Sequence, residues 1–483
     1  MPDPELTLDP SDWSAVRALG HRMLDDMFDH LGGIREQPAW REMPADVKAS
    51  FKAPVPFEAN GLGDVYAGFK DRVLQYTAGN AHPRFWGWVM GSGSAEGMLA
   101  ELLAAGLNIN CGFGFDNPPA QVELQVLDWC RSLFGFPVDS GAAIVSGGSM
   151  ANFVALAVAR DAAAGSAAEQ GLRNLDAPLA FYCSDQTHNS VSKALRLLGL
   201  GREALRTVPT NASYEIDLDA LNRMIAEDRA RGVRPACVIG NAGTVNAGAT
   251  DDLEALAAVA KREGMWFHVD GAFGAIAMLS PTLRRVVKGI EHADSLAFDF
   301  HKWLHVQYEA GCVLVRSAEA HKKPFTEPAS YLKWMERGYA NGPGNFSDYA
   351  PELSRQFKAL KIWMAFQAHG VDTYRRLAEQ NVAQAKYLTG LVEGNPNLEL
   401  LAPTALNIVN FRYRRDGLTE EQLNAVNQEI LMRLQEEGLA VPSGTMLRGK
   451  FAIRCAITNH RSRREDFDAL ADAVLRLGGV VAA

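Results

Sequence analysis

The residues of this chain that could carry chemistry lie at the ends of two short apolar runs. One run, at residues 295–299, is followed closely by His301 and Lys302. The other run, at residues 265–269, is followed directly by Asp270. Both runs have the length and composition of buried β-strands. A lysine at the end of a buried strand is costly unless its amine is used, so Lys302 and Asp270 mark a candidate site.

An aspartate and a lysine at neighbouring strand ends are the two groups that a pyridoxal phosphate (PLP) site needs. The lysine forms a Schiff base with this cofactor, and desolvation at a strand end frees its amine as a nucleophile. The aspartate keeps the pyridinium nitrogen protonated, so that the ring accepts the electron pair left at Cα. Gly271 and Ala272 are small enough for a flat ring to approach the backbone, and Ala272 would face that ring. The structural alternatives are a surface lysine at Lys302 and, at Asp270, a carboxylate that caps the following turn.

A turn of small residues, formed by Gly147, Gly148 and Ser149, stands between an apolar run at 143–146 and a helical pattern. Glycines between a strand and a helix leave backbone N–H groups free to hold a phosphate, and the helix dipole adds to this attraction. The Ser149 hydroxyl supplies a further donor. Many tight turns have this composition, so the turn predicts a phosphate site only in combination with Lys302.

Residues 268–272 (HVDGA) and 298–303 (FDFHKW) resemble the two signature stretches of the PLP-dependent group II decarboxylases. That family includes the aromatic-L-amino-acid, histidine and glutamate decarboxylases. The similarity runs from about residue 82 to about residue 377, and the two motifs are specific in this order and at this separation. The resemblance implies PLP as the cofactor, decarboxylation of an amino acid, and a homodimer with a shared active site.

The resemblance also implies roles for single residues. It stacks His188 on the pyridine ring, where an imidazole fixes the ring plane and can contribute to proton transfer. It brings the Thr244 hydroxyl to the phenolic oxygen of the cofactor or to the substrate carboxylate, and it places His301 near the phosphate or the substrate. The alternative for His188 is a purely structural histidine that forms hydrogen bonds. The alternative for Thr244 is a threonine that only stabilises a turn. Phe300 stands where the family commonly has proline.

A long irregular stretch at residues 322–350 interrupts the regular elements, and such stretches are usually functional or disordered. In the resembling family a mobile loop from the partner subunit closes over the site here and excludes water. A tyrosine at the position of Tyr331 protonates Cα there after carbon dioxide leaves, and Tyr339 and Tyr349 are nearby alternatives. Phenylalanine at this position accompanies aldehyde formation in some relatives, so Tyr331 favours simple decarboxylation. Arg355 matches an arginine that the family uses near the site.

The elements that must position these residues follow an alternating pattern. Helical patterns at 150–163, 190–199, 217–231, 251–263 and 281–288 separate most of seven β-like runs, at 142–146, 179–183, 204–208, 236–240, 265–269, 295–299 and 312–316. Such alternation predicts an α/β fold with a mostly parallel seven-stranded sheet and helices on both faces. Ligands bind these sheets beyond the carboxyl ends of the strands. The seven strands also match the large domain of fold type I PLP enzymes.

The rest of the chain predicts two smaller parts. Helical patterns at 12–32 and 63–76 have too little apolar surface to fold alone, and in the resembling family this arm wraps the partner subunit. The other end predicts a small α+β domain with strands at 408–413 and 451–455 and helices at 419–437 and 464–477. Further helices are expected at 95–107, 119–134, 353–369 and 372–392. We expect an N-terminal helical arm at 1–90, a large PLP-binding domain at 91–365 and a small C-terminal domain at 366–483.

Composition limits the partners of the 483-residue chain. The net charge of −9 is mild and spread along the chain, which gives no reason to expect nucleic acid or an anionic membrane as a partner. The six cysteines are far apart and form no CxxC or Cys/His cluster, so neither a metal site nor a disulfide framework is indicated. No apolar run could span a bilayer, and the acidic N-terminus resembles no secretory signal. We expect a soluble cytoplasmic protein.

The expected substrate is an L-amino acid with an aromatic or apolar side chain. Aromatic residues at 85–88 support this, and the resemblance places that stretch in the substrate pocket, although a core strand and turn would have the same pattern. Phe113 and Phe115 also suggest a substrate with an aromatic or apolar side chain. Relatives that take dopa have a bulky aromatic residue and a threonine where this chain has Val89 and Gly91, and the lack of a clear basic pair disfavours glutamate.

The main hypothesis is therefore decarboxylation of an L-amino acid to the amine and carbon dioxide through a Lys302 Schiff base. One alternative is another PLP reaction on the same scaffold, either oxidative decarboxylation–deamination to an aldehyde or transamination. A second alternative is a non-catalytic binding or assembly module. Such a module should lack the lysine, the aspartate or the ring histidine, and this chain has all three. A pyruvoyl-type decarboxylase is disfavoured because its lysine would be idle.

Overall fold

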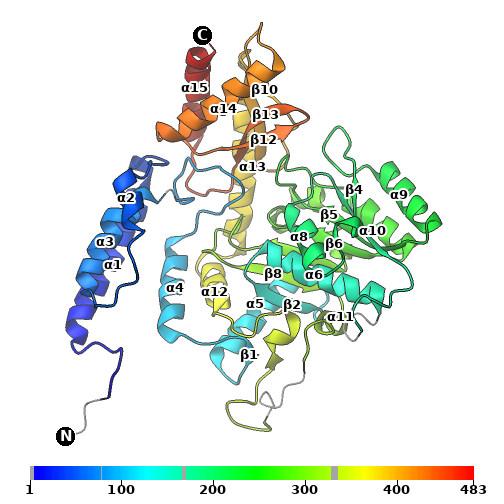
Figure 1. Cartoon of the computed structure of the whole chain (residues 1–483), viewed down its shortest axis with the longest axis horizontal. Coiled ribbons are helices and arrows are strands. Elements are labelled where there is room, and N and C mark those ends of the chain that lie inside the picture. The colour runs from blue at the N-terminus through cyan, green and yellow to red at the C-terminus, as the bar shows by residue number, and fades with distance from the viewer. Residues whose placement is uncertain (1–4, 78, 166–169, 328–334, 483) are drawn as a thin grey trace.

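The structure is a computed structural model that describes residues 5–77, 79–165, 170–327 and 335–482. Its largest sheet has seven strands in the order β2-β8-β7-β6-β5-β3-β4. Figure 1 shows part of this sheet beside α6 (Gly148–Ala164) and α8 (Asn189–Leu197). The strands are β2 (Gly141–Val145), β3 (Leu179–Ser184), β4 (Leu205–Val208), β5 (Arg234–Asn241), β6 (Trp266–Asp270), β7 (Ser295–Asp299) and β8 (Gly311–Val315). Strand β8 runs opposite to the other six strands of this sheet, and β7, β6, β5, β3 and β4 pair in parallel, so the predicted α/β architecture with a mostly parallel sheet is confirmed.

Helices cover both faces of this sheet because successive strand residues point to opposite sides. On one face Tyr182, Phe267 and Phe298 belong to the same core as α5 (Pro118–Phe134), α9 (Leu218–Ala230), α10 (Leu253–Glu263) and α12 (Lys358–His369). On the other face Phe181 and Ile239 pack with α6 (Gly148–Ala164) and α8 (Asn189–Leu197). Except for the edge strand β4, the strands are therefore buried on both sides, and a ligand can reach them only at their ends.

The connection between β6 and β7 differs from the prediction. Where a helix is expected at 281–288, the structure has only the short 3-10 helix η5 (Arg284–Val287), with η4 (Gly274–Leu279) before it and η6 (Ile290–His292) after it. Pro281 disfavours a helical conformation at the residue before it, which limits the run on its N-terminal side. Gly289 has a φ of 106°, and a Cβ there would lie 2.6 Å from the backbone nitrogen of Glu254. Residues 281–288 have the apolar spacing of a helix, but Pro281 and Gly289 limit the segment on both sides, and no α-helix forms between them.

Three other elements complete the large part of the chain. They are α4 (Ala95–Leu107), α11 (Ala318–Lys322) and a two-stranded ladder of β1 (Phe113–Gly114) with β9 (Gly344–Asn345). Short 3-10 turns lie at η1 (Ile34–Glu36), η2 (Leu74–Tyr76), η3 (Arg202–Ala204) and η8 (Phe346–Tyr349). The predicted helix at 353–369 begins later, at Lys358, because the backbone N–H of Arg355 is bound by the Asn110 side chain at 2.9 Å.

The C-terminal part is an antiparallel sheet with helices packed on it, as predicted. Its strands β10 (Leu398–Leu400), β11 (Ile408–Tyr413), β12 (Ser443–Leu447) and β13 (Lys450–Ala456) lie in the order β10-β11-β13-β12. Helices α13 (Val371–Glu393), α14 (Glu420–Glu436) and α15 (Arg464–Val481) share its core. The edge strands β10 and β12 are not predicted from the sequence.

The N-terminal helices α1 (Trp13–Gly32), α2 (Ala45–Ser50) and α3 (Leu62–Arg72) lie outside the main body (Figure 1). The aromatic segment after them is irregular, with a single bridge from Phe85 to Val441. Trp86 is fully buried in this segment and stacks on Phe467 of α15 at 4.9 Å. The helices that the structure describes include none that is long and apolar enough to cross a membrane.

Candidate active site

A pocket of about 340 Å³ lies where the strands of the large sheet end and the turn after β2 begins. It is lined by eight of the nine residues predicted to bind the cofactor, namely Gly147, Gly148, Ser149, His188, Asp270, Ala272, His301 and Lys302. These residues come from four separate segments of the chain. The fold therefore brings the predicted lysine, carboxylate, imidazole and small-residue turn to one place.

The turn at Gly147 and Gly148 is shaped by the side chains beneath it. A Cβ at Gly148 would lie 2.8 Å from Oδ2 of Asp299, and a Cβ at Gly147 would lie 3.1 Å from Cε1 of His301. Helix α6 begins at Gly148 without a side-chain cap. Its first N–H groups therefore remain available to an anion, as a phosphate site requires.

Asp270 is held by a chain of buried hydrogen bonds. The side-chain amide of Asn152 donates to Oδ2 at 2.9 Å, and the backbone N–H of Ala272 donates to Oδ1 at 3.2 Å. The carbonyl oxygen of Asn152 lies 2.9 Å from Nε2 of His268, whose Nδ1 lies 2.9 Å from the Ser295 hydroxyl. Burial lowers the pKa of His268, so this imidazole is neutral and relays hydrogen bonds without adding charge. The sequence alone does not single out Asn152 or His268.

His188 caps the start of α8. Its Nδ1 lies 2.8 Å from the Ser190 hydroxyl and accepts the Ser190 backbone N–H at 3.2 Å. Burial lowers the pKa of His188, which favours the neutral ring. Because Nδ1 is an acceptor, the proton of the neutral ring sits on Nε2. The Ser190 hydroxyl also accepts from Asn152 at 3.0 Å, so the imidazole and the Asp270 carboxylate share one network.

Lys302 forms an ion pair with Asp299, whose Oδ2 lies 3.0 Å from Nζ. His301 bonds through Nδ1 to the carbonyl of Ala310 at 2.9 Å, and burial lowers its pKa. Its ring lies 4.3 Å from that of Tyr308, which also lines the pocket. Asp299 belongs to the motif that predicts Lys302, but its contact with the lysine is learned only from the structure.

Phe300, which replaces the family's usual proline, is buried and packs edge-on against Phe298 at 5.1 Å. Thr244 is the predicted cofactor residue that does not line the pocket. It is buried in the loop after β5, and its hydroxyl has no hydrogen-bond partner among the residues described. Its predicted contact with the cofactor or substrate stays a prediction.

Tyr331 lies outside the described residues. Tyr339 stacks on Phe115 at 4.6 Å, Tyr349 packs edge-on against a buried histidine, and neither lines the pocket. Arg355 is also elsewhere: its guanidinium binds Glu123 at 2.5 Å and the carbonyl of Ile144 at 2.7 Å. The arginine is thus committed to buried structural partners.

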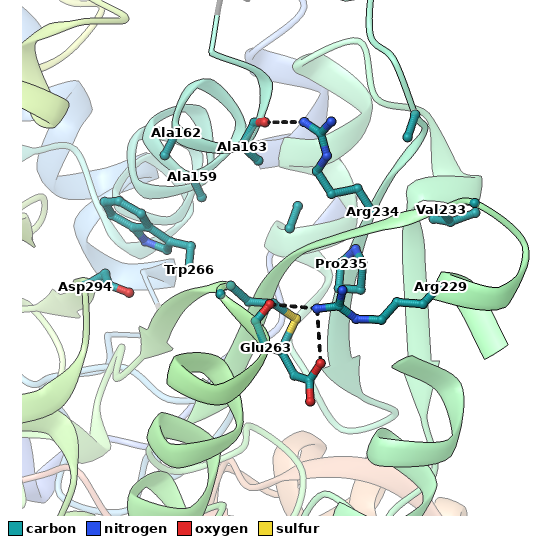
Figure 2. Close-up of a pocket in the computed structure, with 15 residues that line it drawn as sticks. Ala159, Ala162, Ala163, Arg229, Val233, Arg234, Pro235, Glu263, Trp266 and Asp294 are labelled. Carbon is teal, nitrogen blue, oxygen red and sulfur yellow. Dashed lines mark hydrogen bonds and ion pairs between the residues drawn. The ribbon is translucent and has the colours of Figure 1, made fainter. Parts of the chain in front are cut away.

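A larger pocket of about 630 Å³ opens at the other edge of the sheet, around the first residues of β5 and β6 (Figure 2). Its charged side chains are already paired. Arg229 lies 3.1 Å from Glu263, and Arg234 donates to the carbonyl of Ala163 at 2.9 Å. Lys302, His188 and Asp270 do not line it. The smaller pocket is therefore the candidate active site.

The smaller pocket fits the PLP group that the resemblance implies. The uncapped start of α6 suits the phosphate, and the buried Asp270 carboxylate suits a protonated ring nitrogen. Lys302 supplies the amine. Over the described ranges, no group of three or more histidine, cysteine, aspartate or glutamate side chains could hold a metal ion.

Comparisons with known proteins agree with this chemistry. The model of the pyridoxal-dependent decarboxylase conserved domain matches residues 44–414. The aromatic-L-amino-acid decarboxylase of Bacillus atrophaeus is 33% identical over 458 residues, which are 93% of this chain and 93% of that protein. The phenylacetaldehyde synthase of Arabidopsis thaliana is 30% identical over 461 residues, again 93% of each. The crystal structure of Oryza sativa TDC with PLP and tryptamine matches with a TM-score of 0.89 at 26% identity, covering 98% of this chain and 99% of that one.

Proposed function

Because the chain belongs to the pyridoxal-dependent decarboxylase family, we propose that it converts an aromatic L-amino acid to the corresponding amine and carbon dioxide. Membership makes the chain a PLP-dependent carboxy-lyase. The observation that carries the proposal is the convergence of Lys302, Asp270, His188 and an uncapped helix N-terminus on one pocket. The relative from Bacillus atrophaeus supports an aromatic substrate.

PLP, when bound, supplies a ring that accepts the electron pair left at Cα when carbon dioxide departs. In this proposal Lys302 carries the cofactor, and the backbone of Gly147 and Gly148 holds the phosphate with the Ser149 hydroxyl. Asp270, oriented by Asn152, keeps a proton on the ring nitrogen. The imidazole of His188 fixes the plane of the ring, with Ala272, His301 and Thr244 completing the site.

The proton that returns to Cα needs a donor above the ring. We propose Tyr331, carried on a loop that closes over the site of a second copy of the chain, with His188 as the other candidate. A donor on a closing loop would also keep water out while the carbanionic charge exists.

A homodimer is part of this proposal. Apolar side chains remain exposed on the arm and on α4, including Trp13 (63%), Phe57 (95%) and Leu103 (51%). Exposed apolar side chains of this size support a contact with a second copy of the chain. We further propose the arm at 1–90, the large domain at 91–365 and the small domain at 366–483 as the units of each copy, and the cytoplasm as their location.

Oxidative decarboxylation–deamination to an aldehyde is the second candidate function. Its support is the similarity to the phenylacetaldehyde synthase of Arabidopsis thaliana at 30% identity. Tyr331 favours the amine, because the resemblance associates aldehyde formation in some relatives with phenylalanine at that position.

Incubation of the PLP-loaded protein with single L-amino acids tests both candidates. Aromatic, aliphatic and acidic amino acids are supplied separately, and products are identified by mass spectrometry. We expect an amine that is lighter than its aromatic substrate by carbon dioxide, and no product from the Lys302→Ala variant. An aldehyde with ammonia and hydrogen peroxide would favour the second candidate. Turnover of acidic but not aromatic amino acids would overturn the substrate proposed here.

A further inference from the structure

We propose that the hydroxyl of Tyr308 donates a hydrogen bond to the phosphate of PLP and so completes the phosphate site. This inference rests on the proposed PLP chemistry and adds a side chain to the predicted turn of Gly147, Gly148 and Ser149. Tyr308 lies outside both signature stretches of the sequence, in the segment between Lys302 and β8. Its place in the pocket, its unpaired hydroxyl and the charges around it support this role.

The first observation is the place of Tyr308 beside the predicted phosphate turn. Its ring lies 4.3 Å from the ring of His301, and both residues line the pocket. A Cβ at Gly147 would lie 3.1 Å from Cε1 of the same imidazole, so His301 contacts the turn as well as the phenol ring. A Cβ at Gly311 would lie 2.5 Å from Cα of Gly147, so the backbone that follows Tyr308 also packs against the turn. Tyr308 therefore lies at the phosphate end of the pocket.

The second observation is the state of the Tyr308 hydroxyl. It forms no hydrogen bond with the residues that the structure describes. The side chain is 48% exposed, so a ligand in the pocket can reach it. Partial burial raises the pKa of Tyr308, and the nearby Asp299 carboxylate raises it further, so the phenol keeps its proton. A phenol that keeps its proton can donate to an anion.

The third observation is the charge of the pocket. Of the described residues that line it, Lys302 is the only lysine or arginine, and the proposed Schiff base uses its amine. Asp270 and Asp299 contribute carboxylates to the same lining. Burial lowers the pKa of both lining histidines, which favours their neutral forms. The chain therefore relies on neutral N–H and O–H donors to hold a phosphate, and the Tyr308 hydroxyl is a donor without another partner.

A comparison of PLP with pyridoxal, which lacks the phosphate, tests this inference. Both aldehydes can form the same bond with Lys302, so the difference between their affinities isolates the phosphate contacts. Each is titrated into the full-length protein freed of cofactor, and binding is followed by absorbance. A hydrogen bond to a charged group contributes enough that we expect Y308F to bind PLP about tenfold more weakly or worse. The affinity for pyridoxal should stay unchanged, because phenylalanine keeps the ring that packs on His301.

The matched control is Y387F, which removes the same atom from a tyrosine far from the pocket. The Tyr387 hydroxyl donates to Asp468 at 2.6 Å in the C-terminal part, so both PLP and pyridoxal should bind this variant as they bind the unmodified protein. Unchanged PLP affinity in Y308F would overturn the inference. Equal weakening of PLP and pyridoxal would overturn it too, because Tyr308 would then act on the ring or on Lys302 and not on the phosphate.

The phosphorus NMR resonance of bound PLP gives a second readout. At saturating PLP we expect this resonance to differ between Y308F and the unmodified protein, and identical resonances would contradict a bond from Tyr308 to the phosphate. Neither measurement needs turnover. The product test with single amino acids can therefore fail while the phosphate contact holds, and Y308F can leave PLP binding unchanged in a protein that still forms the amine.

Discussion

At the scale of single residues, the bond from Asn152 to Asp270 is the contact that most directly orients the carboxylate. Alanine at 152 would leave Oδ2 of Asp270 without this donor and Nε2 of His268 without its acceptor. An unpaired buried polar group costs ~1–3 kcal/mol, so we expect N152A to bind PLP about tenfold more weakly or worse, with a similar loss of kcat. Titration with PLP followed by absorbance measures this. N427A is the control: Asn427 is buried but binds only backbone in the C-terminal part, so its loss should lower the melting temperature without weakening PLP.

Residue types at strand ends are enough to predict Lys302 and Asp270, because a charged group after an apolar run has few structural uses. The same logic misses Asn152 and His268, which resemble ordinary buried polar residues until their partners are known. One signal for Asn152 is available: it follows Ser149 by three residues, and such positions share a helix face. Arg355 is the opposite case: it matches a family position near the site, but its guanidinium donates a hydrogen bond to the buried Glu123.

At the scale of elements, the start of α6 is the part of the fold most sensitive to a single methyl group. A Cβ at Gly148 would meet Oδ2 of Asp299 at 2.8 Å and Cβ of Ala272 at 3.5 Å. We expect G148A to push the turn away from the pocket and to weaken PLP binding about tenfold or more. The same change at Gly390, within α13 and with open space around it, should stabilise the protein by about 0.5–1 kcal/mol. Equal PLP affinity in the two variants would contradict the assignment of this turn to the phosphate.

Short apolar runs, most of them separated by helical patterns, predict all seven strands of the central sheet, because six of these strands are buried along nearly their whole length. The prediction fails where an element depends on its neighbours. The apolar run at 281–288 cannot become an α-helix between Pro281 and Gly289. The edge strands β10 and β12 are short or half-exposed, and they form because β11 and β13 offer unpaired edges.

At the scale of the whole molecule, the exposed leucines of α4 argue for a second copy of the chain. Leu103 is 51% exposed beside two other exposed leucines, Leu102 and Leu107. We expect L103K to lower the mass measured by light scattering from twice that of one chain towards that of one chain. Activity should fall with it, because the proposed proton donor comes from the second copy. M432K is the control, since Met432 is similarly exposed but lies on α14, and its mass should stay unchanged.

The stability of the whole molecule should also depend on pH through its buried histidines. Burial lowers the pKa of His321 to about 3 and that of His460 to about 4, against about 6.5 in an unfolded chain. Between these values the unfolded chain binds more protons than the folded one. Stability is therefore full above pH 6.5 and falls as the pH drops towards 4. Melting temperatures measured from pH 8 to 4.5 should follow this course.

A variant of His321 can distinguish protonation of buried histidines from a general loss of stability in acid. It is fully buried, with the ring of Tyr349 at 5.0 Å and that of Phe325 at 6.4 Å, so phenylalanine fits the chemistry of its surroundings. H321F removes one titrating group, and we expect its melting temperature to fall less between pH 6.5 and 4.5 than that of the unmodified protein. H21F changes an exposed histidine on α1 and should leave the slope as it was. If the melting temperature of H321F fell more steeply with decreasing pH than that of H21F, protonation of the buried His321 would not be the cause of the lost stability.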